Sequence, residues 1–249
     1  MEKGYGAMGF YEEISKYYDY IFPISSETVD YIRRIAGNPP KNILDVACGT
    51  GGYSLELEKH GYNLTAVDID KEMIEGLRVK ALSQGSKIEY LQASMLELKE
   101  KLNDKVFDAV FCIGNSLPHL DCNDEIGEFL NDAKALLISG GTLIIQTINF
   151  DRVLAKDVRS LPTISNEAVG LSFERFYRYE HTLNKVFFKT ILTVEGKRIE
   201  NEIPLTPVRH DEMVEMLKSA GFTEVNVFGD FSNSKYDKEN SYLMVIEAK

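Results

Sequence analysis

Ile43-Leu-Asp-Val-Ala-Cys-Gly-Thr-Gly-Gly52 runs from a short apolar strand through a glycine bend into the start of a helix. Glycines at 49 and 51 let the backbone turn sharply and approach a ligand closely, because they carry no Cβ atom. The acidic Asp45 stands within the end of the strand. The string therefore favours a ligand-binding strand–turn–helix over a plain connection between two elements.

Outward from this string, to about Phe150, short apolar strands alternate with amphipathic helices. Each predicted strand is rich in Val, Ile, Leu or Phe and is bounded by Gly, Asn, Asp or Lys. Strands are predicted at 42–46, 63–68, 87–92, 106–111 and 141–148, and helices at 52–60, 71–83 and 124–137. This spacing predicts βαβ units and an α/β, doubly wound parallel sheet with both faces covered.

The pattern changes on either side of this core. Before it, the aromatic segment 10–36 predicts two helices. After it, three extended segments at 172–182, 185–194 and 198–205 predict a small inserted antiparallel sheet with hairpin turns. A helix at 210–220 then leads to closing strands at 224–228 and 242–247. The loop between the closing strands is too short for a βαβ crossover, so they should pair antiparallel.

A second motif, Ala66-Val-Asp68-Ile-Asp70, ends the second strand. In doubly wound folds an acid there accepts hydrogen bonds from ribose hydroxyls, which assigns Asp68, whereas Asp70 suits a helix N-cap. A dinucleotide site would favour a third glycine where this chain has Ser54. S-adenosylmethionine (SAM) has no phosphate and needs only close backbone approach, a ribose acid and an adenine pocket. The sequence matches the SAM case better.

Composition limits the partners. The 249 residues carry a formal net charge of −11, which repels nucleic acid and anionic membrane surfaces. Three cysteines at no paired spacing suggest reduced thiols, and no run approaches the roughly 18 apolar residues of a membrane helix. No clustered carboxylates or histidines stand at metal-ligand spacing. We expect a cytoplasmic protein, a monomer or homodimer, with no metal.

The string Leu44–Gly51 together with Asp68 resembles the class I SAM-dependent methyltransferases, and the resemblance covers nearly the whole chain. It implies a Rossmann-like methyltransferase fold with a seven-stranded, mostly parallel sheet and the cofactor over the carboxyl ends of the first strands. It also implies three parts: an N-terminal helical lid at 1–40, a SAM-binding core at 41–150 and 207–249, and a substrate cap at 151–206.

The resemblance also assigns cofactor contacts. Asp68 would hold the ribose, the bend at 45–51 would face the methionine part, and a tyrosine from the lid would cover the cofactor. Met73 has an equal alternative as helix core, and simple packing is an alternative for either tyrosine. The implied cofactor-binding residues are Tyr11, Tyr18, Asp45, Ala47, Gly49, Gly51, Asp68, Ile69, Met73, Ala93, Ser94, Met95, Cys112 and Gly114.

A third motif, Phe111-Cys-Ile-Gly-Asn-Ser-Leu-Pro-His-Leu120, ends the fourth strand. With Asn149-Phe-Asp151 it resembles the glycine and sarcosine N-methyltransferase subgroup, in which this turn lies beside the reactive methyl group. Asn115 and His119 are thereby implied as catalytic and substrate-contacting residues. The alternative is a polar loop in which the asparagine caps a turn and the histidine is merely exposed.

One departure from the subgroup bears on the substrate. Glycine methyltransferases hold the substrate carboxylate with an arginine just before the Asn of Asn149-Phe-Asp151, and this chain has Ile148 there. An apolar side chain cannot bind a carboxylate. A second arginine, expected in the N-terminal segment, is also missing. Substrate contacts from the cap and its border would then come from Arg175, Tyr177 and Arg209, with Arg178 as a further source of charge.

The expected activity is in-line methyl transfer to a small-molecule acceptor, with an amine favoured and an oxygen acceptor as the alternative. A neutral amine attacks directly, whereas a phenol benefits from a base, for which His119 is the first candidate and His210 the second. Positioning supplies most of the acceleration. A nicotinamide-dependent oxidoreductase and a non-catalytic SAM-binding protein are the alternatives from other classes.

Overall fold

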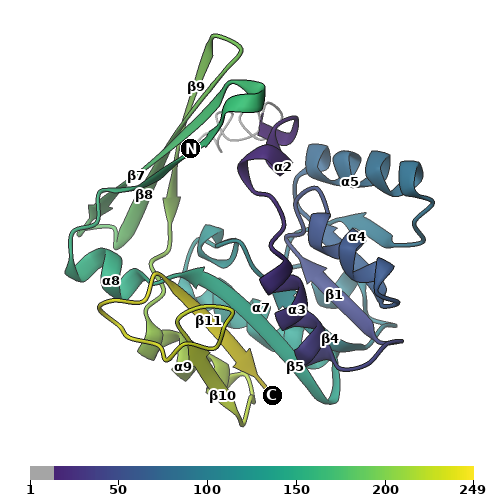
Figure 1. Ribbon diagram of the computed structural model, residues 1–249. Coiled ribbons are helices and arrows are strands. Elements are labelled where there is room, and N and C mark those ends of the chain that lie inside the picture. The colour runs from purple at the N-terminus through teal and green to yellow at the C-terminus, as the bar shows by residue number, and fades with distance from the viewer. Residues whose placement is uncertain (1–13) are drawn as a thin grey trace.

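The computed structural model describes residues 14–249, and its centre is a seven-stranded sheet (Figure 1). The strand order is β10-β11-β5-β4-β1-β2-β3. Only β11 runs antiparallel to its neighbours; the other strands run in one direction. The strands are β1 (Asn42–Val46), β2 (Asn63–Asp68), β3 (Glu89–Gln92), β4 (Phe107–Cys112), β5 (Leu137–Ile148), β10 (Val225–Phe228) and β11 (Leu243–Ala248).

Helices cover both faces of this sheet, which is why its central strands are buried along almost their whole length. One face packs on α3 (Ser26–Ala36), α4 (Gly52–Lys59) and α5 (Lys71–Gln84). The opposite face packs on α6 (Leu98–Lys101), α7 (Asn123–Leu136) and α9 (His210–Ser219). No helix within residues 14–249 combines the length and the apolar character that crossing a membrane requires.

The strand order reverses beside β1, which pairs with β2 on one side and with β4 on the other. In an open α/β sheet, ligands bind at such a switch point, outside the carboxyl ends of the strands. Because these strands are parallel, Val46, Asp68 and Cys112 end their strands at the same edge. The three sequence motifs are thereby gathered at one edge of the sheet.

The inserted antiparallel sheet has four strands, not the three predicted from sequence. Its order is β6-β7-β8-β9, with β6 (Ser160–Asn166), β7 (Leu171–Glu180), β8 (Lys185–Val194) and β9 (Lys197–Leu205). The missed strand, β6, contains Pro162, and its register with β7 shifts between Leu161 and Ile164. A proline and a bulge are tolerated at a sheet edge but break the alternating pattern by which a strand is recognised.

α2 (Tyr18–Ile21) falls, with α3, in the segment 10–36 for which two helices were predicted, and it lies beside the inserted sheet in Figure 1. Two short helices were missed from sequence: α6, and α8 (Phe150–Ala155), which connects β5 to the inserted sheet. One-turn helices η1 (Leu117–His119) and η2 (Glu167–Val169) fall in segments that sequence left unassigned. β5 starts four residues earlier than predicted because Leu137 already pairs with Phe107. Elements of four to six residues are too short to develop a helical repeat of apolar positions.

Gly51 is fixed by packing as well as by its backbone. It has φ +72°, and a Cβ atom there would overlap with Cδ1 of Leu77 on α5. The bend at the end of β1 therefore lies directly against α5. Gly85, at the end of α5, has a similar φ of +65° but open space around its missing Cβ.

Gly51→Ala should cost about 2–4 kcal/mol of unfolding free energy, the sum of left-handed strain and overpacking. Gly85→Ala should cost only the strain, about 1–2 kcal/mol. Urea unfolding followed by circular dichroism measures both. Equal losses in the two variants would contradict the close packing of the bend on Leu77.

Candidate active site

The bend after β1 alternates in and out of the left-handed region. Ala47, Gly49 and Gly51 have φ values of +59°, +55° and +72°. Glycine adopts this conformation freely, whereas alanine at position 47 stores strain of about 1 kcal/mol or more. A strained residue persists only where its surroundings hold it, so the bend is fixed from outside.

The side chain of Asp68 holds the bend after β1 in place. Its Oδ2 accepts the backbone N–H of Gly49 at 2.8 Å, and its Oδ1 accepts the backbone N–H of Asp70 at 2.9 Å. Burial raises the pKa of the carboxyl group, while these two amides oppose the rise. Each carboxylate oxygen keeps a lone pair beyond the amide it accepts, so the group can still bind hydroxyl donors. Asp70 caps α5, as predicted, by accepting from Glu72 N and Met73 N.

Asp45 has a partner that the sequence did not suggest. Its Oδ2 accepts a 2.6 Å hydrogen bond from the Ser54 hydroxyl, and both side chains are buried. Burial raises the pKa of Asp45 to about 7, with the nearby Asp68 adding to the rise and Ser54 opposing it. Ser54 thus replaces the third glycine of a dinucleotide site with a contact that ties α4 to the end of β1.

Helix α2 covers the glycine bend. A Cβ atom at Gly49 would lie 2.8 Å from the Tyr18 hydroxyl oxygen, so the Tyr18 ring packs directly against this glycine. Asp19 joins the two segments further, accepting from the Thr50 hydroxyl at 2.7 Å and pairing with Lys80 at 2.6 Å. Tyr11, the other predicted covering tyrosine, lies outside the described residues.

The implied cofactor-binding residues that follow β2 and β3 differ in exposure. Ile69, just after Asp68, leaves 67% of its surface exposed, whereas Met73 is buried against Phe173 and Ile21. Burial of Met73 favours its alternative role as packing. After β3, Ala93 donates its backbone N–H to Asp68 O at 2.9 Å, and Met95 packs against the core. Ser94 Oγ accepts from Leu96 N and so holds the turn beyond β3.

The turn after β4 is anchored on β5. Gly114 donates its N–H to Gln146 Oε1 at 2.8 Å, and Asn115 Oδ1 accepts the N–H of Ile148 at 2.9 Å. Asn115 has φ +64°, a conformation that asparagine tolerates better than most residues. Among the described residues, nothing bonds to the Asn115 side-chain amide nitrogen, which remains a donor. Cys112, at the end of β4, is fully buried, and burial raises the pKa of its thiol.

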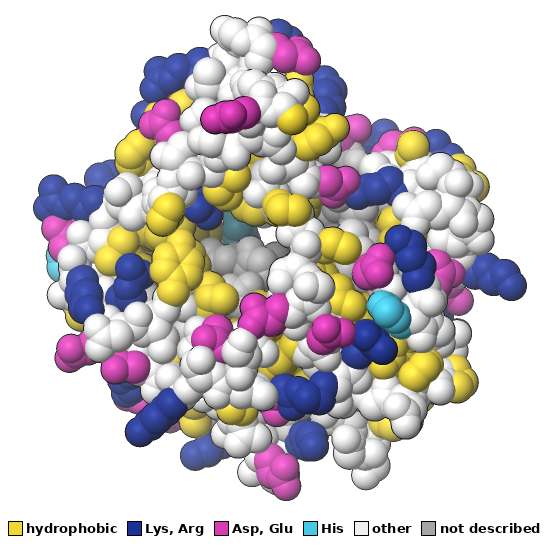
Figure 2. Space-filling model, in the orientation of Figure 1, with side chains coloured by type: hydrophobic (Ala, Val, Ile, Leu, Met, Phe, Trp, Pro, Cys, Tyr) yellow, Lys and Arg dark blue, Asp and Glu magenta, His cyan; other side chains and the backbone are white. Residues whose placement is uncertain are grey.

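His119 ends η1 beyond this turn. The ring is exposed, yet the protein atoms around it lower its pKa to about 4. Figure 2 shows a hollow between the inserted sheet and the core, with hydrophobic side chains around its opening.

Comparison with known proteins identifies this arrangement. Residues 43–141, which contain the glycine bend, Asp68 and the turn at Asn115, match the family described as "Methyltransferase domain". The protein is an S-adenosylmethionine-dependent methyltransferase.

The similar proteins agree on the chemistry and the fold. The methyltransferase is 24% identical over 250 residues to the glycine/sarcosine N-methyltransferase of Aphanothece halophytica, across 97% of this chain and 88% of that one. It is 36% identical over 107 residues to the ubiquinone biosynthesis O-methyltransferase of Rickettsia prowazekii, across 43% and 40% of the two chains. The structure of the CcbJ methyltransferase from Streptomyces caelestis superposes with a TM-score of 0.80 at 21% identity, across 96% and 97%. Relatives named as N- and as O-methyltransferases both occur, so the acceptor must be inferred from the site.

The Asn149-Phe-Asp151 motif has a structural role in the methyltransferase that sequence did not suggest. Asn149 is buried and donates to the carbonyl oxygens of Asp237, Lys238 and Ser241, closing the loop before β11. Its Oδ1 accepts from Arg152 N and from the Tyr236 hydroxyl. These partners lie up to 92 residues away, so no local pattern could reveal them.

Two predicted residues have other partners. His210 stacks on Tyr236 and lies 2.7 Å from Asp211 Oδ1, so its ring is occupied at the start of α9. Arg209 is exposed and pairs with Glu212 of the same helix. The structure therefore does not bring Arg209 together with Asn115 and His119 as a substrate contact. Tyr177 is buried in the cluster that contains Ile148.

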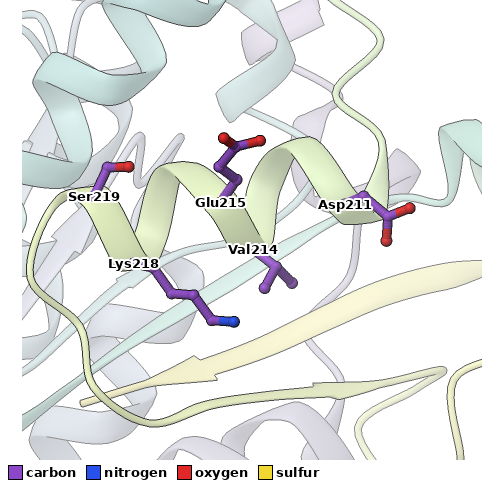
Figure 3. A pocket seen from close by; sticks show the side chains of 5 residues that line it. All are labelled: Asp211, Val214, Glu215, Lys218 and Ser219. Carbon is purple, nitrogen blue, oxygen red and sulfur yellow. The ribbon is translucent and has the colours of Figure 1, made fainter.

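A shallow pocket on α9 lies apart from the site. It is lined by Asp211, Val214, Glu215, Lys218 and Ser219. Figure 3 shows Val214 and Lys218 leaving the helix on one side and Glu215 and Ser219 on the other. These side chains do not converge on a common point, so the carboxyl edge of the sheet is the better candidate for catalysis.

The raised pKa of Asp45 predicts a loss of stability with rising pH. Between the ordinary carboxyl value near 3.8 and about 7, the folded state binds more protons than the unfolded state. Unfolding free energy should fall across this window by up to roughly 1.4 kcal/mol for each pH unit. In Asp45→Asn the side chain still accepts from Ser54 but cannot titrate. The variant should therefore lose this part of the fall in unfolding free energy with pH.

Urea unfolding of wild type and Asp45→Asn at several pH values from 4 to 8 tests this, with the difference between them as the readout. Ser54→Ala serves as the matched variant. It removes a hydrogen bond that lowers the pKa of Asp45, so the transition should move to higher pH. If the difference in unfolding free energy between wild type and Asp45→Asn does not vary with pH, the raised pKa of Asp45 is contradicted.

Proposed function

We propose that the methyltransferase methylates the nitrogen of a small-molecule amine. The observation that carries the proposal is the turn after β4, where Asn115 Oδ1 accepts from Ile148 N at 2.9 Å and the side-chain amide nitrogen remains a donor. His119 follows in the same segment, and desolvation lowers the pKa of its ring. At neutral pH this ring is uncharged and too weak a base to deprotonate a phenol effectively. A neutral amine needs no base to attack. The site therefore suits nitrogen better than phenolic oxygen.

The residues at the carboxyl edge fit the cofactor. Asp68 has lone pairs for ribose hydroxyls, the glycines at 49 and 51 let a ligand approach the backbone, and exposed Ile69 offers an apolar face. Where a dinucleotide site would have its third glycine, this chain has Ser54, whose hydroxyl donates to Asp45. S-adenosylmethionine supplies an electrophilic methyl group on a sulfonium sulfur when it is bound.

The chain's own groups would then position the acceptor. The Asn115 amide nitrogen has no partner among the described residues and can donate to the acceptor, while Ile148 N–H holds the side-chain oxygen. His119, without a hydrogen-bond partner among residues 14–249, can accept or donate one bond as a neutral ring. We assign both as orienting residues. Neither adds a positive charge near the sulfonium, and such a charge would oppose cofactor binding.

The surrounding segments would enclose the reaction. We propose that residues 1–40 form a lid, supported by the packing of Tyr18 on Gly49. Residues 151–206 would form the cap over the acceptor, supported by burial of Tyr177 against Ile148. Residues 41–150 and 207–249 would form the cofactor-binding core.

Turnover assays with matched panels of amines and phenols test the proposed function. Methylated amines, detected with S-adenosylhomocysteine by mass spectrometry, are expected. Methylation of phenols alone would contradict the assignment to nitrogen. Thermal stabilisation by NAD but not by SAM or S-adenosylhomocysteine would contradict the cofactor assignment.

Asp68→Asn should weaken SAM binding by roughly 10- to 100-fold, because a charged acceptor for the ribose is lost. Calorimetric titration with SAM measures the change. Asp70→Asn is the matched control, since asparagine caps a helix as well as aspartate does and should leave the affinity unchanged. Equal affinities in the Asp68 variant and the wild type would exclude the ribose role.

Asn115→Gly should slow methyl transfer by roughly 10- to 100-fold with little change in SAM affinity, because acceptor orientation is lost. Glycine keeps the positive φ, so the backbone is not strained. Asn233→Gly, at an exposed position with φ +63°, is the control for the backbone change. Single-turnover rates provide the measurement. A parallel drop in SAM affinity would instead point to a role in cofactor binding.

A further inference from the structure

Two arginines lack acidic partners in a strongly acidic protein. Of the nine arginines in the chain, seven pair with a carboxylate. Within the described residues, Arg152 and Arg175 have no such partner. With a net charge of −11 there is no shortage of carboxylates, so these two positive charges stand out.

Arg175 lies on the inner face of β7, between two buried residues. Side chains alternate along a strand, so residues 173, 175 and 177 share one face. Phe173 is buried with Met73 in the cluster beneath α2, and Tyr177 is buried with Ile148 at the end of β5. Arg175 is therefore placed between the cofactor side and the acceptor side of the hollow.

Thr190 on β8 is directly opposite Arg175 in the antiparallel register, and its side chain therefore shares the same face. The Arg175 Nε and the Thr190 Oγ1 are both buried without a hydrogen-bond partner. A buried donor without a partner destabilises the fold, so a ligand that accepts from it is favoured. A second nitrogen of Arg175, Nη2, donates to Pro162 O at 2.7 Å and so fixes the guanidinium. Arg175 and Thr190 thus present two polar groups, available for hydrogen bonds, on a face that is otherwise apolar.

Arg152 approaches from α8. Its guanidinium lies 5.3 Å from the centre of the Tyr242 ring, and its Nη1 is also buried without a partner. The charges of Arg152 and Arg175 both act to lower the pKa of the Tyr177 phenol, against the larger effect of burial. Both positive charges therefore act on one tyrosine, which belongs to the cluster that contains Ile148.

We propose that Arg175, Thr190 and Arg152 form a subsite for an anionic group of the methyl acceptor, a carboxylate or a phosphate monoester. Planar guanidinium groups bind such anions through paired N–H donors, and the threonine hydroxyl adds a third donor. Ile148 leaves no cation next to Asn115. The anion of the acceptor is therefore held away from the methylated nitrogen, on the inserted sheet. This inference rests on the proposed function for the identity of the acceptor.

Anion binding is tested first, independently of turnover. Acetate and inorganic phosphate are titrated separately into ¹⁵N-labelled protein with S-adenosylhomocysteine present, and the arginine Nε–H resonances are followed by NMR. The Arg175 resonance, assigned by its loss in Arg175→Lys, should shift saturably with at least one anion. Arg178, on the opposite face and paired with Glu202, is the internal control. No saturable shift at Arg175, or the same shift at Arg178, would overturn the subsite.

The acceptor is tested next with ω-amino acids of increasing chain length, their amides, and phosphoethanolamine. The anionic amines should be methylated with a kcat/KM at least about tenfold above the matched neutral amines, mainly through KM. Arg175→Gln should abolish this preference, whereas Arg178→Gln should keep it. A preference that survives in Arg175→Gln, or equal use of anionic and neutral amines, would overturn the proposal. The more active of the carboxylate and phosphate series identifies the anion.

The proposed amine methylation and the proposed anion subsite would be contradicted by different results. Saturable anion binding at Arg175 without methylation of any amine would overturn the proposed amine acceptor and support the subsite. Methylation of neutral amines without anion binding would support the proposed function and overturn the subsite.

Discussion

Two backbone N–H groups, from Gly49 and Asp70, converge on the carboxylate of Asp68, and the candidate site depends on this contact. The contact joins the ends of β1 and β2, the two strands beside the point where strand order reverses. It restrains a bend in which Ala47 is strained and Gly51 touches Leu77. Because both amides are satisfied by one buried side chain, the loop is shaped before any ligand arrives, which lowers the cost of ordering it on binding.

Charge is distributed unevenly along the hollow. Buried acids, Asp45 and Asp68, lie at the glycine bend, where a cationic sulfonium compound would bind, whereas Arg152 and Arg175 lie toward the inserted sheet. Between them the turn at Asn115 is neutral, since the pKa of His119 is too low for a proton at physiological pH. The arrangement would favour an acceptor that carries its negative charge at the end remote from the methyl donor.

Local patterns in the sequence predicted much of the core and less of the site. The bounds of β1 and β2 and the cap at Asp70 agree with the structure because each depends on neighbouring residues. β6 was missed because Pro162 and a bulge interrupt its alternation. The bond from Ser54 to Asp45, and the contacts of Asn149 with the loop at 237–241, depend on tertiary proximity that no short stretch of sequence encodes.

Asn149 has a consequence for how such enzymes diversify. The residue joins β5 to α8 and at the same time closes the loop before β11, through Ser241 and its neighbours. A graft that replaced everything after Phe150 would separate this asparagine from the helix it caps. A chimaera that exchanges only 156–205 would retain that junction intact. Modular exchange of acceptor-binding sheets between related scaffolds is therefore expected to succeed at internal boundaries of the cap, just after the helix that leads into it.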